Sequence, residues 1–127
     1  MNDISKTASY RLAVSDREIF YPPIRKLLRE AKSVLSIAHP FSDGDALGAQ
    51  VALHRLCKAM GKRSVFLNFD PIPETISWLG ANEASFELSR DDHFDLVFLL
   101  ETTDIQRMKE RSRFFEHGKI RIHLDHH

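Results

Sequence analysis

The chain has 127 residues, of which 43% are hydrophobic and 28% charged, as expected for one globular domain or a part of one. Lysine plus arginine and aspartate plus glutamate number 18 each, and this balance excludes bulk electrostatic binding to long nucleic acid or to an anionic membrane. No run approaches the roughly 20 apolar residues of a membrane span, and the N-terminus lacks the apolar core of a signal peptide. The single cysteine, Cys57, forbids an internal disulfide and favours a reduced, cytoplasmic location.

Short helices and strands alternate in the first half of the chain. The first dozen or so residues are polar and mixed, and we expect residues 1–23 to form a peripheral N-terminal extension. A helix is predicted over 22–32, with proline in its first turn, and a strand over 33–38. A second helix is predicted from residue 45 to about residue 60, with Gly61 as its C-terminal cap. Helical spacing places its apolar face on Ala46, Ala49, Leu53, Leu56, Cys57 and Met60.

The second half of the chain continues the alternation. Strands are predicted over 62–69, 95–101 and 119–124, a short helix that ends at Gly80 within 70–80, and a longer helix over 104–118. The run over 95–101 is continuously apolar, which is typical of a strand buried on both faces. This order predicts an α/β fold, a Rossmann-like three-layer domain with a mainly parallel sheet. Cys57, inside an apolar helical pattern, is expected to be buried and inert.

Polar side chains follow three of the predicted strands. His39, Asp43 and Asp45 come after 33–38, Glu101 and Asp104 after 95–101, and the last strand is followed by Asp125, His126 and His127. Parallel strands deliver their carboxyl ends to one edge of the sheet, where ligands of open α/β sheets bind. Imidazole and carboxylate without thiolate suit Mn²⁺, Mg²⁺ or Fe²⁺. A pair of such ions, which activates a bridging water for displacement at phosphorus, would use all of these groups.

Several of these residues have a simpler interpretation. In that interpretation, Asp43 or Asp45 would cap the second helix, and Glu101 would be a solvated carboxylate. Asp104, in contrast, is close enough to Glu101 to be considered as a substitute ligand. Outside the strand ends, we expect His54, His93 and His117 to be surface residues. A basic run that begins near the same edge is interpreted as a solvated helix face, or as a contact to phosphates: Arg107, Lys109, Arg111 and Arg113.

Three motifs resemble those of the DHH phosphoesterase superfamily. They are "HPFSDGDALG" at 39–48, "LVFLLETTDIQRM" at 96–108 and "LDHH" at 124–127, and the likeness runs from about residue 24 to the end. Within that superfamily the chain most resembles the bacterial branch of oligoribonucleases and 3′-phosphoadenosine 5′-phosphate phosphatases. The resemblance implies a cytoplasmic hydrolase that uses two Mn²⁺ ions, or Mg²⁺, on short oligonucleotides or nucleoside 3′,5′-bisphosphates.

The resemblance also implies a role for each site residue. His39 and Asp43 would hold one ion, Asp45 and His126 the second, and Glu101 would bridge both. Asp125 would orient the histidine ligand, and His127 would lie near the substrate phosphate. A hydroxide that bridges the metals would be the nucleophile.

The sequence departs from the family at two points. The bridging position is usually aspartate, and the extra methylene of Glu101 shifts its carboxylate by about a bond length. The family also continues after its third motif, so 24–127 correspond to the N-terminal part of a catalytic domain, with a sheet incomplete at its C-terminal end. An uncovered last strand favours a homodimer. The alternatives are a truncated or degenerate relative that binds metal or nucleotide without turnover, and an inorganic pyrophosphatase.

Overall fold

The chain divides into two compact units, Met1–Ala31 and Lys32–His127. The computed structural model describes residues 17–41, 43–102, 106, 112–116 and 118–125. In the first unit, helix α1 (Arg17–Glu30) begins five residues before the predicted start, with Pro22 and Pro23 in its interior. Proline favours the first turn because it lacks an N–H group, and this rule placed the predicted start too late. The carboxyl group of Glu18 in the first turn instead complements the helix dipole there.

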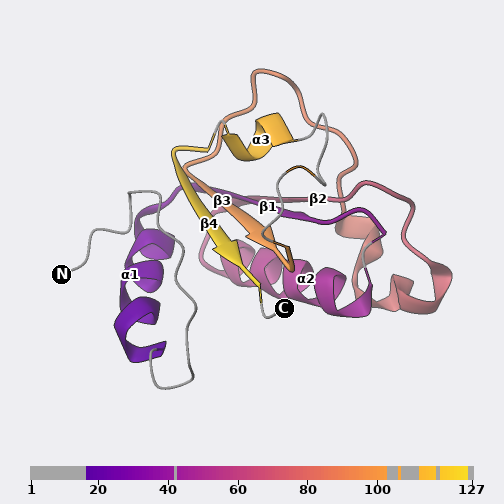
Figure 1. Cartoon of the computed structure of the whole chain (residues 1–127), viewed down its shortest axis with the longest axis horizontal. Coiled ribbons are helices and arrows are strands. Elements are labelled where there is room, and N and C mark those ends of the chain that lie inside the picture. The colour runs from indigo at the N-terminus through magenta and orange to yellow at the C-terminus, as the bar shows by residue number, and fades with distance from the viewer. Residues whose placement is uncertain (1–16, 42, 103–105, 107–111, 117, 126–127) are drawn as a thin grey trace. The chain divides into compact units, whose positions relative to one another are not determined.

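The second unit is built on a four-stranded parallel sheet in the order β2-β1-β3-β4 (Figure 1). Its strands are β1 (Ser33–Ala38), β2 (Arg63–Leu67), β3 (Leu96–Leu100) and β4 (Ile120–Leu124). All four predicted strands are present, and β3 is buried along its whole length, as its continuous apolar run predicts. The α/β fold with a parallel sheet is therefore confirmed.

Helices cover both faces of this sheet, which gives the three layers of a Rossmann-like domain. Helix α2 (Gly44–Ala59) lies against one face and α3 (Ser112–Glu116) against the other (Figure 1). On the α3 side, the core joins alternate residues of β1 and β3 to two phenylalanines of α3: Leu35, Ile37, Val97, Leu99, Phe114 and Phe115. On the α2 side, Phe66 of β2 packs with Leu47 and Val51. The two central strands, β1 and β3, are therefore buried on both faces.

The buried face of α2 differs from the predicted one. Leu56 and Met60 are 49% and 41% exposed, whereas the buried residues are Ala46, Leu47, Gln50, Val51, His54 and Cys57. Two of these are polar, and each has partners on the sheet. The amide Nε2 of Gln50 donates to the carbonyl oxygens of Ser36 (3.4 Å) and Leu67 (3.1 Å). The prediction that His54 lies on the surface is wrong.

The remaining connections follow the predicted turn chemistry. Gly61 has a φ of 74° after the last turn of α2, as expected of a C-terminal cap. The short helix after β2 is the 3₁₀ helix η2 (Glu74–Leu79), which ends at Gly80 with a φ of 105°, and η3 (Ala81–Glu83) follows. Of the helix predicted over 104–118, Ser112–Glu116 is helical, while 104–105, 107–111 and 117 lie outside the described residues. In the described part of the chain, no helix has the length and apolar character that crossing a membrane requires.

Candidate metal centre at the carboxyl edge of the sheet

The register of the sheet brings three of the predicted site residues onto one row. Ala38 of β1 pairs with Leu100 of β3, and Leu100 pairs with Leu124 of β4. The residues that follow directly are His39, Glu101 and Asp125. The backbone N–H of Glu101 donates to the carbonyl of Leu124 at 2.8 Å, so the pairing of β3 with β4 continues into this row. Because adjacent strands lie about 4.8 Å apart, these three residues are neighbours at the carboxyl edge.

Asp43 and Asp45 lie at the same edge because α2 begins directly after the loop that follows β1. Asp43 is the N-cap of α2, and its Oδ1 accepts a hydrogen bond from the backbone N–H of Ala46 at 2.9 Å. Asp45 is in the first turn, and both side chains are exposed. The capping interpretation thus holds for Asp43. Since the cap uses only Oδ1, it does not compete with coordination of a cation through Oδ2.

The ring of His39 has a defined tautomer. Its Nδ1 lies 2.7 Å from the carbonyl oxygen of Pro40, and because a carbonyl can only accept, Nδ1 must carry the proton. In the neutral imidazole the lone pair is then on Nε2. A histidine that binds a metal through one nitrogen usually donates its other N–H to a carbonyl or carboxylate. The hydrogen bond at Nδ1 is therefore of the kind that accompanies coordination through Nε2.

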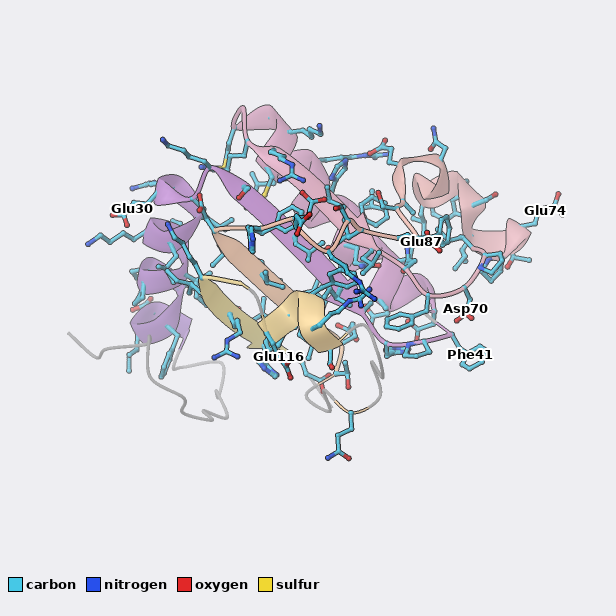
Figure 2. All side chains as sticks on the ribbon, turned by 90° about the horizontal axis from the view of Figure 1, so that it is seen from above. Glu30, Phe41, Asp70, Glu74, Glu87 and Glu116 are labelled. Atoms are coloured by element: carbon cyan, nitrogen blue, oxygen red, sulfur yellow. The ribbon has the colours of Figure 1, made fainter. Side chains whose placement is uncertain are left out.

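Backbone strain is concentrated at this edge. In the described part of the chain, the non-glycine residues with positive φ are Phe41 at 58° and Glu101 at 65°. Each lies in the loop directly after a strand, β1 for Phe41 and β3 for Glu101. The left-handed conformation costs an L-residue roughly 1–2 kcal/mol, and such strain clusters at functional sites. The backbone N–H of Phe41 is held by Asp70 Oδ2 at 2.8 Å, and Figure 2 shows the two side by side.

The donor chemistry at this edge fits a hard divalent cation. The edge collects an imidazole and the carboxyl groups of Asp43, Asp45, Asp70, Glu101 and Asp125, whereas the thiol of Cys57 is buried in α2. Within the described ranges, no three histidine, cysteine or acidic side chains converge closely enough to hold an ion. His126, His127 and Asp104 lie outside the described residues. Coordination by the five predicted ligands accordingly stays a prediction.

A second polar cluster, which the sequence analysis missed, lies toward the opposite end of α2. A surface depression there is lined by His54, Arg55, Lys58, Ser64 and Glu83. His54 Nδ1 is 2.8 Å from Ser64 Oγ, and its Nε2 is 3.4 Å from Glu83 Oε2. Burial lowers the pKa of His54, and the charges of Lys58 and Arg55 act in the same direction against that of Glu83. This cluster joins α2, β2 and η3, and no motif spacing in the sequence indicates it.

The other polar residues singled out from the sequence have mixed outcomes. His93 is exposed, as predicted, and Cys57 is fully buried, with the pKa of its thiol raised by that burial. Arg113 is half-buried with its guanidinium 4.8 Å from the centre of the Phe114 ring, so it does not belong to a solvated face. His117, Arg107, Lys109 and Arg111 lie outside the described residues.

Comparison with known proteins supports the fold and no closer relationship. Neither a protein-family model nor a curated protein matches the sequence. Among solved structures, the chain is similar to an exopolyphosphatase-related protein from Bacteroides fragilis, with a TM-score of 0.75 and 18% sequence identity over 87% of this chain. The chain spans 35% of that protein's length. At this identity the likeness establishes a shared α/β fold.

Proposed function

We propose that the chain forms part of a metal-dependent phosphoesterase that hydrolyses short oligonucleotides or nucleoside 3′,5′-bisphosphates. The observation that carries the proposal is the row of His39, Glu101 and Asp125 at the carboxyl edge, with Asp43 and Asp45 at the start of α2 beside it. The three DHH-like motifs and the fold shared with an exopolyphosphatase-related protein support a phosphate ester or anhydride as the substrate bond.

Each residue of the site has a proposed task. His39 and Asp43 would hold one divalent ion, and Asp45 and His126 would hold the second. Glu101 would bind both ions. Bound divalent ions supply Lewis acidity and a nucleophilic water at neutral pH. Asp125 would orient His126, and His127 would bind the substrate phosphate. The hydrogen bond from His39 Nδ1 to the Pro40 carbonyl puts the lone pair of the neutral ring on Nε2, the atom that would coordinate, and the hydrogen bond from Ala46 N–H to Asp43 Oδ1 orients that carboxylate.

Binding of a phosphate substrate at this edge would also require cations, for an electrostatic reason. A phosphate brought to the carboxyl groups of Asp43, Asp45, Asp70, Glu101 and Asp125 would be repelled by their negative charge. Divalent ions held by these residues would offset this repulsion, so substrate and metal are expected to bind together.

A second candidate function is hydrolysis of a condensed phosphate such as pyrophosphate. The structural neighbour, an exopolyphosphatase-related protein, favours it. The two functions share the same metal site and differ in what surrounds the scissile phosphate. The longer side chain of Glu101 at the bridging position instead favours a relative that binds metal or nucleotide without turnover.

The test measures phosphate or nucleotide release from the dinucleotide pApA, from 3′-phosphoadenosine 5′-phosphate and from pyrophosphate, with Mn²⁺ and with EDTA. Asp45→Asn is expected to lower metal-dependent turnover at least 100-fold, because it removes one charged ligand. Asp91→Asn, at an exposed position in the loop before β3, is the control for loss of one carboxylate. Absence of metal-dependent turnover on all three substrates would overturn the enzyme proposal, and Mn²⁺ binding without hydrolysis would favour the non-catalytic relative.

A further inference from the structure

The side chain of Phe41 is the most exposed large hydrophobic group in the described part of the chain, at 84%. It lies between His39 and Asp43, two residues from each, so its Cα is within about 7 Å of both Cα atoms. Single exposed apolar residues are common and need no explanation by themselves. Phe41 differs from them because it stands inside the loop that supplies proposed metal ligands.

The backbone of this loop holds the ring out in solvent. Phe41 adopts the left-handed conformation, at a φ of 58°. This conformation is unfavourable for most residues, and glycine, asparagine and aspartate adopt it most readily. A hydrogen bond of 2.8 Å from its N–H to Asp70 Oδ2 ties the loop to the segment after β2. Figure 2 shows the Phe41 ring pointing away from the fold beside Asp70. A strained and anchored aromatic residue at the rim of the site indicates a contact with ligand rather than with the core.

We propose that Phe41 is a specificity-determining residue whose ring stacks on the nucleobase of the substrate while the adjacent row receives its phosphate. The inference rests on the proposed function for the location of the phosphate. Every nucleobase has a π-face, so stacking on an aromatic side chain recognises nucleotides of any sequence. A condensed phosphate has no apolar surface and gains nothing from this ring. Phe41 therefore selects nucleotides over polyphosphates.

Binding is measured separately from turnover, with Mg²⁺ present and with a single tryptophan as the reporter. The chain has one tryptophan, Trp78, which is 77% exposed, so the double variant Phe41→Trp, Trp78→Phe moves the reporter onto the proposed platform. Its fluorescence is expected to be quenched by pApA and unchanged by tripolyphosphate. Phe41→Ala in the native background is expected to weaken pApA binding by roughly 5- to 100-fold and to leave tripolyphosphate binding within twofold.

Two control variants accompany this test. Leu56→Ala removes an exposed apolar side chain of α2 that lies about 18 Å along the helix axis from Gly44, and it should leave pApA affinity unchanged. Asp70→Ala removes the anchor of the loop and should weaken pApA binding in the same sense as Phe41→Ala. Because the Phe41 ring is exposed, its truncation is expected to leave the unfolding midpoint unchanged, and this is checked by circular dichroism.

The outcomes separate the two proposals. Unquenched fluorescence together with unchanged pApA affinity in Phe41→Ala overturns the role of Phe41, even if the protein hydrolyses phosphate esters. Quenching by pApA without hydrolysis of any substrate supports the stacking role and overturns the enzyme proposal. If Phe41→Ala instead alters the molar mass measured by light scattering without altering pApA affinity, the ring contacts a second copy of the chain and the inference is overturned.

Discussion

Gly118, between α3 and β4, lies close to Val97 of β3. A Cβ atom at this position would stand 2.5 Å from Val97 Cγ2 and 3.0 Å from Val97 Cβ. Val97 is fully buried, and rotation about its χ1 angle would not relieve the contact with Val97 Cβ, because that atom does not move with χ1. We predict that Gly118→Ala lowers the free energy of unfolding by about 1–3 kcal/mol, the usual cost of overpacking a core. Urea denaturation monitored by circular dichroism measures this.

Gly48, inside α2, is the matched control for this prediction. A Cβ atom there would meet nothing within 4 Å, and alanine is favoured over glycine in a helix. Gly48→Ala is therefore expected to raise the free energy of unfolding by about 0.5–1 kcal/mol. Equal effects of the two substitutions would contradict the close approach of Gly118 to Val97.

His54 makes the stability of the protein depend on pH. Burial holds its pKa below the ordinary value of 6.5, so between that lowered pKa and 6.5 the unfolded chain binds more protons than the folded one. Its contribution to stability is therefore complete above about pH 6.5 and is lost as the pH falls below that value. We predict a steeper loss of unfolding free energy between pH 7.5 and 5.5 in the native protein than in His54→Gln.

The control for His54 is His93→Gln, which removes an imidazole from an exposed loop position. His123 also has a lowered pKa, through partial burial and the charge of Arg121, and it remains in both variants. The comparison of urea midpoints across pH thus isolates His54. Identical pH profiles for the native protein and His54→Gln would show that its imidazole is not desolvated.

Asp43, the N-cap of α2, has an observed capping role and a proposed role as a metal ligand, which substitution can separate. Serine caps a helix about as well as aspartate but is a poor ligand for a hard cation, whereas alanine does neither. We predict that Asp43→Ala lowers the free energy of unfolding by about 0.5–2 kcal/mol, that Asp43→Ser changes it little, and that both lose Mn²⁺ binding measured by calorimetry. Native Mn²⁺ affinity in Asp43→Ser would show that Asp43 is a cap alone.

The elements differ in how well their sequence predicts them. The strand β3 is recognisable because its residues form an uninterrupted apolar run, which is typical of a strand buried on both faces in the interior of a sheet. The apolar pattern of α2 does not identify its buried face, because that face includes two polar residues. Gln50 and His54 are buried since Ser36, Leu67 and Ser64 supply hydrogen-bond partners from other strands. Such partners are distant in sequence, so spacing within the helix cannot reveal them.

At the scale of the whole molecule, a cation that binds only the folded state raises its stability by mass action. At 100 times the dissociation constant the gain is about 2.7 kcal/mol. We predict that Mn²⁺ raises the melting temperature by several degrees, that EDTA reverses the rise, and that Asp45→Asn abolishes it. A melting temperature insensitive to Mn²⁺ would contradict the metal centre.

The sheet topology explains which part of the site was predictable. Once β1, β3 and β4 are parallel and in this register, the positions of His39, Glu101 and Asp125 follow from where each apolar run stops. The orientation of the side chains does not follow, because it depends on loop conformation. The left-handed backbone of Glu101 and of Phe41 has no signature in the sequence, since neither residue is one that favours it.

The two hydrogen bonds from Gln50 to the carbonyl oxygens of Ser36 and Leu67 limit how far α2 can move. They join α2 to β1 and β2 about 9 Å along the helix axis from Gly44, inside a closely packed layer. Sliding or rotation of α2 would break both bonds of a fully buried side chain, so the backbone at the start of α2, with Asp43 and Asp45, is held in place relative to the sheet. Part of the entropy cost of ordering the start of α2 is therefore incurred during folding, before any ion that the proposed site would bind arrives.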